Sequence, residues 1–118
     1  MSAVRELPAA AITDAVERLC IEANTRLPAD VKAALDKAEA AEPWPLAKET
    51  LGLLQKNLCA AKEKDLPICQ DTGMACVFVE LGQDVHIGGD LTEAVNEGVR
   101  RGYEKAYLRK SITADPLQ

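Results

Sequence analysis

The stretch that decides the fold is residues 66–81, with the sequence LPICQDTGMACVFVEL. Ahead of it, apolar side chains recur at helical spacing. Pro67 stops any helix there, because proline lacks the N–H that a helical ladder requires. Residues 75–81 are apolar and rich in β-branched side chains, a composition typical of a strand. The stretch therefore separates a helical first half from a mixed second half.

Three helices are predicted ahead of this stretch. In residues 9–25 apolar side chains recur every three or four positions, which predicts an amphipathic helix. Pro28 interrupts that pattern and suits the first turn of a second helix. Residues 43–45, Pro-Trp-Pro, separate the second helix from a third over about residues 46–63. Aromatic residues make up only 3% of the chain, so we expect a core of Ala, Leu, Val and Ile.

A hairpin and a final helix are predicted after it. Residues 82–84 could turn the chain from the strand at 75–81 into a short second strand at 85–87. Asp90, with an acidic residue three positions on, resembles the start of a capped helix, which we expect to reach about Leu108. The expected fold is α+β and helix-rich, with three N-terminal helices, a short β-hairpin and a further helix.

Composition and charge narrow the classes of function. The chain has 118 residues, which favours one domain. Its net charge of -5 argues against nucleic-acid binding, which depends on cations that neutralise phosphates. Residues 1–6 lack the pattern of a signal peptide, and we see no membrane-spanning stretch. We therefore expect a cytoplasmic protein that binds neither nucleic acid nor membrane, with its four cysteines as thiols or metal ligands.

The loop after Pro67 carries the most informative chemistry. Cys69, Gln70, Asp71 and Thr72 place a thiol, an amide, a carboxylate and a hydroxyl on consecutive positions. Binding groups concentrate on loops that rigid elements hold in place. The alternative is an ordinary polar turn in which Asp and Thr side chains bond their own backbone. The residue types by themselves leave both interpretations open.

The run Cys69-Gln70-Asp71-Thr72-Gly73 resembles the cysteine motif of class I fumarases and of the α subunit of L-tartrate dehydratase. The resemblance continues, in order, along nearly the whole chain. It includes residues 22–24, 27–31, 77–80, 96–103, 108–111 and 115–117. Residues 1–118 are thus similar to the N-terminal portion of an iron–sulfur hydro-lyase α domain. We expect them to be one part of a larger hydro-lyase fold, with more chain to follow.

The resemblance implies a [4Fe-4S] cluster that is held by three cysteines, with one iron left open to substrate. It assigns one ligand to Cys69 and the other two to polypeptide beyond this sequence. Cys20, Cys59 and Cys76 match no ligand position, and we expect them to be small buried hydrophobic residues. A self-contained four-cysteine site is disfavoured, because the chain has no Cys-x-x-Cys pair.

The resemblance also implies the substrate-binding residues: Gln70, Asp71 and Arg109. Asp71 could assist proton transfer as a catalytic residue, and the Gln70 amide could donate to a carboxylate oxygen. The Arg109 guanidinium matches a carboxylate in two hydrogen bonds. By spacing alone, however, Arg101, Lys105 and Arg109 could form a solvated basic stripe.

The function that the resemblance implies is an enzyme, a hydro-lyase that adds or removes water on a C4 dicarboxylate. Fumarate to (S)-malate is the first choice and L(+)-tartrate the alternative. The implied partners are that substrate and a β subunit or C-terminal domain, in a dimeric assembly. We expect no activity without the rest of the chain or the partner subunit. A non-catalytic assembly domain and a basic-helix nucleic-acid binder are the other classes. His86, the one histidine, is expected at the surface or in the hairpin.

Overall fold

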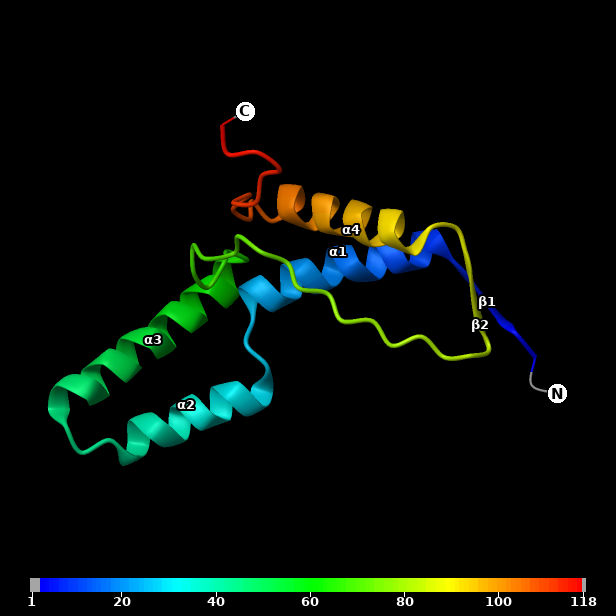
Figure 1. Cartoon of the computed structure of the whole chain (residues 1–118). Coiled ribbons are helices and arrows are strands. Elements are labelled where there is room, and N and C mark those ends of the chain that lie inside the picture. Colours follow the sequence, from blue (N-terminus) through cyan, green and yellow to red (C-terminus); the bar gives the residue numbers. More distant parts are fainter. Residues whose placement is uncertain (1–2, 118) are drawn as a thin grey trace. The chain divides into compact units, whose positions relative to one another are not determined.

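A computed structural model describes residues 3–117. The elements follow in the order β1 (Arg5–Pro8), α1 (Ala9–Thr25), α2 (Ala29–Ala41), α3 (Pro45–Lys64), β2 (Val85–Gly88) and α4 (Leu91–Lys105) (Figure 1). The helix-rich α+β class and the four predicted helices are confirmed. The chain divides into two compact units, one of residues up to Ile21 together with Gln70 onward, the other of Glu22–Cys69. None of the helices between residues 3 and 117 has the length and hydrophobicity that a bilayer crossing requires.

The predicted hairpin is wrong. A short strand does form where the second one was expected, at β2, but its partner is β1. The two strands are parallel, with Arg5 opposite Val85 and Pro8 opposite Gly88. Residues 75–81 form no strand. Their composition suits a pleated sheet, but a ladder also needs a partner row of N–H and C=O groups, and none lies against them in the described chain.

The core of the first unit lies between α1 and α4, which run side by side (Figure 1). Its buried hydrophobic residues are Val16, Cys20, Tyr103 and Leu108, with Ile12, Val95, Val99 and Ala106 packed against them. The residues of α4 in this core recur every three or four positions, which places them on one face of the helix. With so few aromatic residues available, the unit gains burial by close approach of the two helices.

Two glycines of α4 permit that close approach. A Cβ atom on Gly98 would lie 2.7 Å from the Thr13 carbonyl oxygen and 2.7 Å from the Val16 Cβ. A Cβ atom on Gly102 would lie 2.8 Å from the Cys20 Cβ. Since real Cβ atoms do not come so near, any larger residue would push α4 away from α1.

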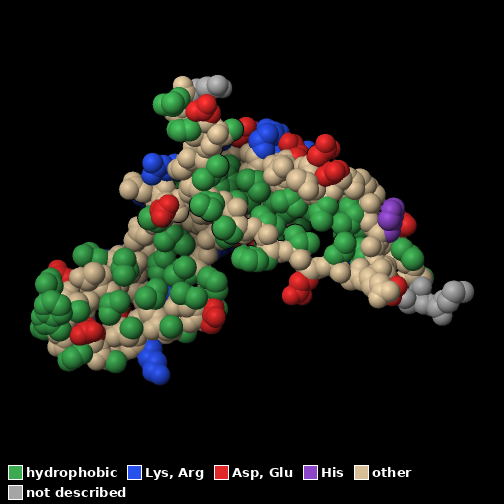
Figure 2. All heavy atoms as spheres, in the orientation of Figure 1, with side chains coloured by type: hydrophobic (Ala, Val, Ile, Leu, Met, Phe, Trp, Pro, Cys, Tyr) green, Lys and Arg blue, Asp and Glu red, His purple; other side chains and the backbone are tan. Residues whose placement is uncertain are grey.

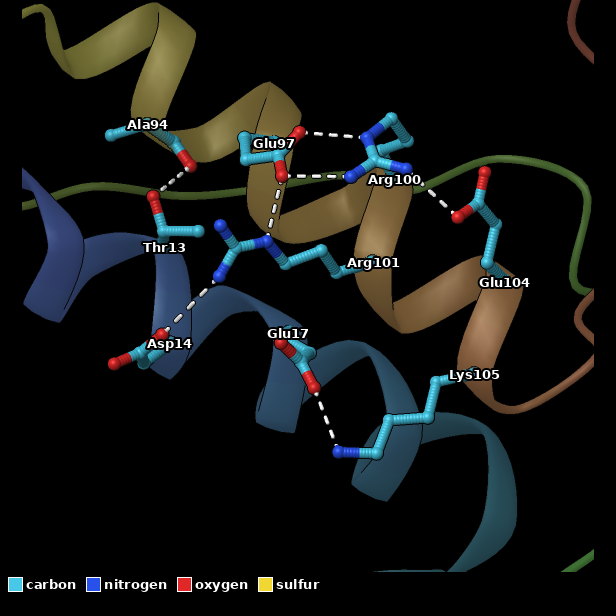
Figure 3. A network of polar contacts seen from close by, with 9 residues as sticks. All are labelled: Thr13, Asp14, Glu17, Ala94, Glu97, Arg100, Arg101, Glu104 and Lys105. Carbon is cyan, nitrogen blue, oxygen red and sulfur yellow. Dashed lines mark hydrogen bonds and ion pairs between the residues drawn. The ribbon is translucent and has the colours of Figure 1, made fainter.

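Polar contacts flank the same helix pair (Figure 3). The Thr13 hydroxyl donates to the Ala94 carbonyl oxygen at 2.9 Å. Lys105 Nζ lies 3.0 Å from Glu17 Oε1. These contacts join positions 81 and 88 residues apart in the sequence, and so they fix how the two helices meet.

Glu97 is the centre of an ion-pair network on α4 (Figure 3). Its carboxylate accepts from Arg100 and, at 2.7 Å, from Arg101 Nε. Arg100 also donates to Glu104 at 2.8 Å, and Arg101 lies 3.6 Å from Asp14 on α1. Hydrogen bonds from Arg100 and then Arg101 lower the pKa of Glu97 from 4.5 to about 2.

Both ends of α4 have clear physical causes. The Asp90 side chain accepts a hydrogen bond from the Glu93 N–H at 2.9 Å, so the predicted cap is confirmed. The helix ends at Lys105, three residues before the expected end near Leu108. Tyr107 has φ 54°, in the left-handed region, which a helix cannot accommodate.

The second unit contains the helical hairpin of α2 and α3. Gln55 donates to Asp36 at 2.7 Å, and Gly52 faces Glu39, so the pairing runs in opposite directions along the two helices. α3 begins with Pro45 in its first turn, as the Pro-Trp-Pro run suggests. It ends at Lys64. The next residue, Asp65, has a φ of 49° and donates its N–H to the Ala61 carbonyl oxygen, which forms a left-handed cap.

This hairpin buries little. α2 has no buried residue, and α3 has one, Ala61. Leu46, Leu53 and Leu54 are 58%, 57% and 48% exposed. Hydrophobic side chains (green in Figure 2) accordingly lie at the surface of the two helices.

Candidate functional site

Thr72 is the buried residue of the cysteine motif, at 5% exposure, while Gln70 and Asp71 are exposed. Its hydroxyl oxygen accepts from the Arg109 backbone N–H at 2.6 Å. Its carbonyl oxygen accepts from the Tyr103 hydroxyl at 2.6 Å. One residue therefore ties the motif to α4 and to the segment that follows α4.

A second contact joins the same two segments. Gly73 packs so closely on Ser111 that a Cβ at position 73 would lie 2.6 Å from both the Cβ and the Oγ of Ser111. Position 73 thus needs a residue without a side chain. Together with the Thr72 bonds, this contact holds residues 72–73 against residues 109–111.

Tyr103 holds the motif through a hydrogen bond from its neutral phenol. Burial raises the pKa of Tyr103, and the neighbouring Cys20 and Cys76 raise it further. The phenol therefore keeps its proton across the neutral range and remains a donor to the Thr72 carbonyl oxygen.

The structure brings three of the four predicted site residues to one end of the first unit. Gln70 and Asp71 precede Thr72 directly, and Arg109 is held by its backbone to the Thr72 hydroxyl. The side chains of all three are exposed. Cys69 is also exposed and is the last residue of the second unit.

Two simpler interpretations of these residues can be compared with the structure. The bond that the Thr72 hydroxyl makes is not to its own backbone, because it accepts from the Arg109 N–H, 37 positions away. Arg109 does not extend a helical basic stripe, because α4 ends at Lys105. Arg101 and Lys105 are instead paired with Glu97 and Glu17.

The cysteine predictions are partly wrong. Cys20 is buried, as expected, and burial raises its pKa, so it is a protonated thiol in the core. Cys59 and Cys76 are exposed, although buried positions were expected. Their segments explain this result: α3 buries only Ala61, and residues 75–81 belong to no sheet. All four cysteines are thiols rather than disulfides.

His86 lies at the surface, as predicted, on β2 rather than in a hairpin. Its Nδ1 atom is 2.7 Å from the Glu6 Oε2 atom across the β1–β2 pair. This contact gives the histidine a place in the small parallel sheet, where Glu6 and His86 stand opposite each other.

The donor set that the described residues offer to a metal is incomplete. Nowhere between residues 3 and 117 do three His, Cys, Asp or Glu side chains gather in a way that could hold an ion. Cys69 offers one exposed thiol at the start of the motif. One thiol could supply a single ligand to a metal site, and by itself it does not form one.

A cavity of about 630 Å³ lies beside the motif in the first unit. Gly73, Tyr103 and Ser111, which fix the motif, also line it, together with Arg100 and Lys110. Gln70, Asp71 and Arg109 are not among its lining residues. Sequence spacing gives no sign of this shared position, because only the fold brings residues 73, 103 and 111 together.

Comparison with known families assigns the chain to one family. The family model described as fumarate hydratase (Fumerase) matches residues 13–118. The chain therefore belongs to the fumarate hydratase family. The match begins within α1 and includes the motif, α4 and Arg109.

Particular relatives are α subunits of tartrate dehydratases. A Methanocaldococcus jannaschii protein, provisionally named L(+)-tartrate dehydratase subunit alpha, is 36% identical over 103 residues, which are 86% of this chain and 36% of that protein. The L(+)-tartrate dehydratase subunit alpha of Escherichia coli K12 is 30% identical over 98 residues, 83% of this chain and 32% of that protein. This chain thus spans about a third of the length of these curated relatives.

Proposed function

We propose that this chain is the cysteine-motif part of a hydro-lyase that adds or removes water on a C4 dicarboxylate. The single observation that carries the proposal is the bond from the Arg109 N–H to the Thr72 hydroxyl. It holds the backbone of Arg109, whose side chain is proposed to bind a carboxylate, beside a motif that carries a thiol, an amide and a carboxylate. Family membership over residues 13–118 supports the same class of reaction.

Each proposed site residue has a distinct task. The Arg109 guanidinium binds one substrate carboxylate through paired hydrogen bonds. The Gln70 amide donates to a second carboxylate oxygen. Asp71 holds or moves a proton at the substrate hydroxyl. Thr72 binds no substrate in this scheme and keeps the arginine segment beside the motif.

Cys69 is proposed to hold one corner of a [4Fe-4S] cluster, and the other two cysteines are proposed to come from the remaining polypeptide of the enzyme. When bound, such a cluster supplies a Lewis acid for the substrate and its water. The exposure of Cys69 supports this role, since a ligand must reach a group outside its own segment. A β subunit or C-terminal domain is the proposed source of the missing ligands.

Fumarate is proposed as the first substrate and L(+)-tartrate as the second. The matching family model is named for fumarate hydratase, whereas the relatives described above carry the tartrate dehydratase name. Both substrates are C4 dicarboxylates, so Arg109 and Gln70 suit either one. The first assay therefore measures both reactions on the same assembled protein.

The test uses the chain assembled with the rest of its enzyme and reconstituted in the absence of air with ferrous iron and sulfide. We expect bound iron and labile sulfide, with hydration of fumarate or dehydration of L-tartrate. Cys69→Ser should lose both the iron and the activity. Cys59→Ser is the matched control, because it also removes an exposed thiol of the same unit, and it should keep both.

Two results would overturn the proposal. Iron retained by Cys69→Ser would remove this thiol from the cluster. An assembled wild-type protein that takes up no iron and turns over neither substrate would favour the non-catalytic assembly domain. Arg109→Gln gives an independent check: loss of a charged hydrogen-bond pair should lower kcat/KM by about 10- to 100-fold, whereas Lys105→Gln should not.

A further inference from the structure

We propose that residues 74–81 are a strand of a β-sheet whose other strands come from the remaining polypeptide of the enzyme. The inference rests on the proposed function only in taking the chain to be part of a larger hydro-lyase. It concerns an interaction surface of the first unit, distinct from the residues proposed to bind substrate.

The backbone of this segment has no hydrogen-bond partner among the described residues. In Figure 1 it is the plain yellow-green trace that leads into β2. Eight consecutive residues thus offer N–H and C=O groups to a neighbour. Such a row is a ready template for strand addition.

The side chains of residues 74–81 also indicate a strand that lacks its neighbours. Val77, Val79 and Leu81, which alternate along the segment, are 42%, 52% and 54% exposed. Phe78, the one phenylalanine of the chain, occupies an intervening position and is 96% exposed. In a pleated strand it would lie on the opposite face from these three residues. A run that is apolar on both faces is typical of a strand buried in a sheet that is covered on both sides.

The length of the relatives identifies the occupant. They carry about twice as much further polypeptide as the matched region, since that region is 32–36% of their length. A second copy of this chain would add only one strand and form a two-stranded ribbon, which is marginal in water. It would also leave Phe78 and its face without a covering layer. A multi-stranded partner from the same enzyme satisfies both the backbone and the side chains.

Glu80 is the one charged residue of the segment, so charge does not select the partner. Shape and backbone pairing remain as the means of recognition. The partner should present an open edge strand with apolar side chains. The sequence of the remaining polypeptide can be searched for such a strand.

Hydrogen exchange of the 74–81 amides tests the proposal. In the chain alone these amides should exchange nearly as fast as in an unfolded peptide. In the assembled enzyme they should exchange at least about 100-fold more slowly, because hydrogen bonds to a neighbouring strand protect them. Equal exchange in the two states would overturn the proposal. Protection that appears in the chain alone on raising its concentration would assign the segment to a second copy and overturn it too.

A pair of variants at one position separates backbone from side chain. Val79→Pro removes an N–H that the chain itself does not use, so the helical circular dichroism of the chain should not change. Assembly with the partner should be lost, because proline cannot donate to a ladder. Val79→Ala keeps the N–H and should still assemble. Assembly of Val79→Pro at the wild-type affinity would contradict the proposal.

The two proposals can fail separately. An enzyme that binds iron and turns over substrate with its 74–81 amides unprotected would overturn the strand and leave the function standing. Protected amides in an assembly that never binds iron or turns over substrate would overturn the function and leave the strand standing.

Discussion

Each of the two units of this chain contains a pair of helices, and the two pairs differ in how closely they pack. α1 and α4 come close enough for glycine to be required at positions 98 and 102, and they bury Val16, Cys20 and Tyr103 between them. α2 and α3 bury only Ala61. The residues proposed to bind substrate adjoin the tightly packed pair. These residues are therefore supported by close backbone contact between α1 and α4 rather than by large side chains.

The largest effect is expected from the glycines. Gly98→Ala should destabilise the α1–α4 pair by about 3 kcal/mol, because the Thr13 carbonyl and the Val16 Cβ must both move. Gly52→Ala is the matched change in α3, where a Cβ meets only the flexible Glu39 carboxylate at 3.2 Å. It should be neutral or stabilising by up to about 1 kcal/mol. Urea unfolding of both variants measures the contrast, and equal losses would contradict it.

A smaller effect is expected at the buried hydroxyl. Thr72→Val leaves the Arg109 N–H without its acceptor, at a cost of about 2 kcal/mol. Thr72→Ser keeps the hydroxyl and should therefore retain most of the stability that Thr72→Val loses. Thr50→Val removes a hydroxyl that bonds the Leu46 carbonyl oxygen on the exposed side of α3, and should change stability little. In the assembled enzyme Thr72→Val should raise KM more than it lowers kcat, since Arg109 is displaced.

Acid should weaken the network on α4. The pKa of Glu97 is lowered from 4.5 to about 2 in the folded chain. Because the folded value is below the unfolded one, the network contributes its full stability above pH 4.5 and loses it as the pH falls towards 2. Glu97→Gln should reduce the change of melting temperature with pH over that range. An unchanged pH profile in this variant would show that Glu97 makes no such contribution.

The smallest effect is expected from the surface ion pair of α2. Lys32 lies 2.5 Å from Asp36, but both side chains are at least 40% exposed. Solvent screening leaves such a pair with little net value, so Lys32→Ala should change the free energy of unfolding by less than about 0.5 kcal/mol. If the melting temperature of this variant fell as much as that of Gly98→Ala, the exposed ion pair would contribute far more to the second unit than solvent screening allows.

Sequence reasoning was most accurate where the signal is local. The Asp90 cap, the break near residues 43–45 and the stop before Pro67 all depend on residues within a few positions of one another, and all are confirmed. It was less accurate where a distant partner decides the outcome. The strand at 75–81 lacked a partner, β2 paired with β1, and Cys59 and Cys76 are exposed.

By itself, the sequence determined the four helices, the family and the residues that the motif offers for chemistry. Periodicity, caps and consecutive motif positions are properties of neighbouring residues, so they can be read from the chain. Only the tertiary structure decided that the Thr72 hydroxyl accepts from Arg109 and that Gly98 lies against Thr13. Those contacts join positions tens of residues apart, and they depend on how α4 packs on α1 rather than on any local preference.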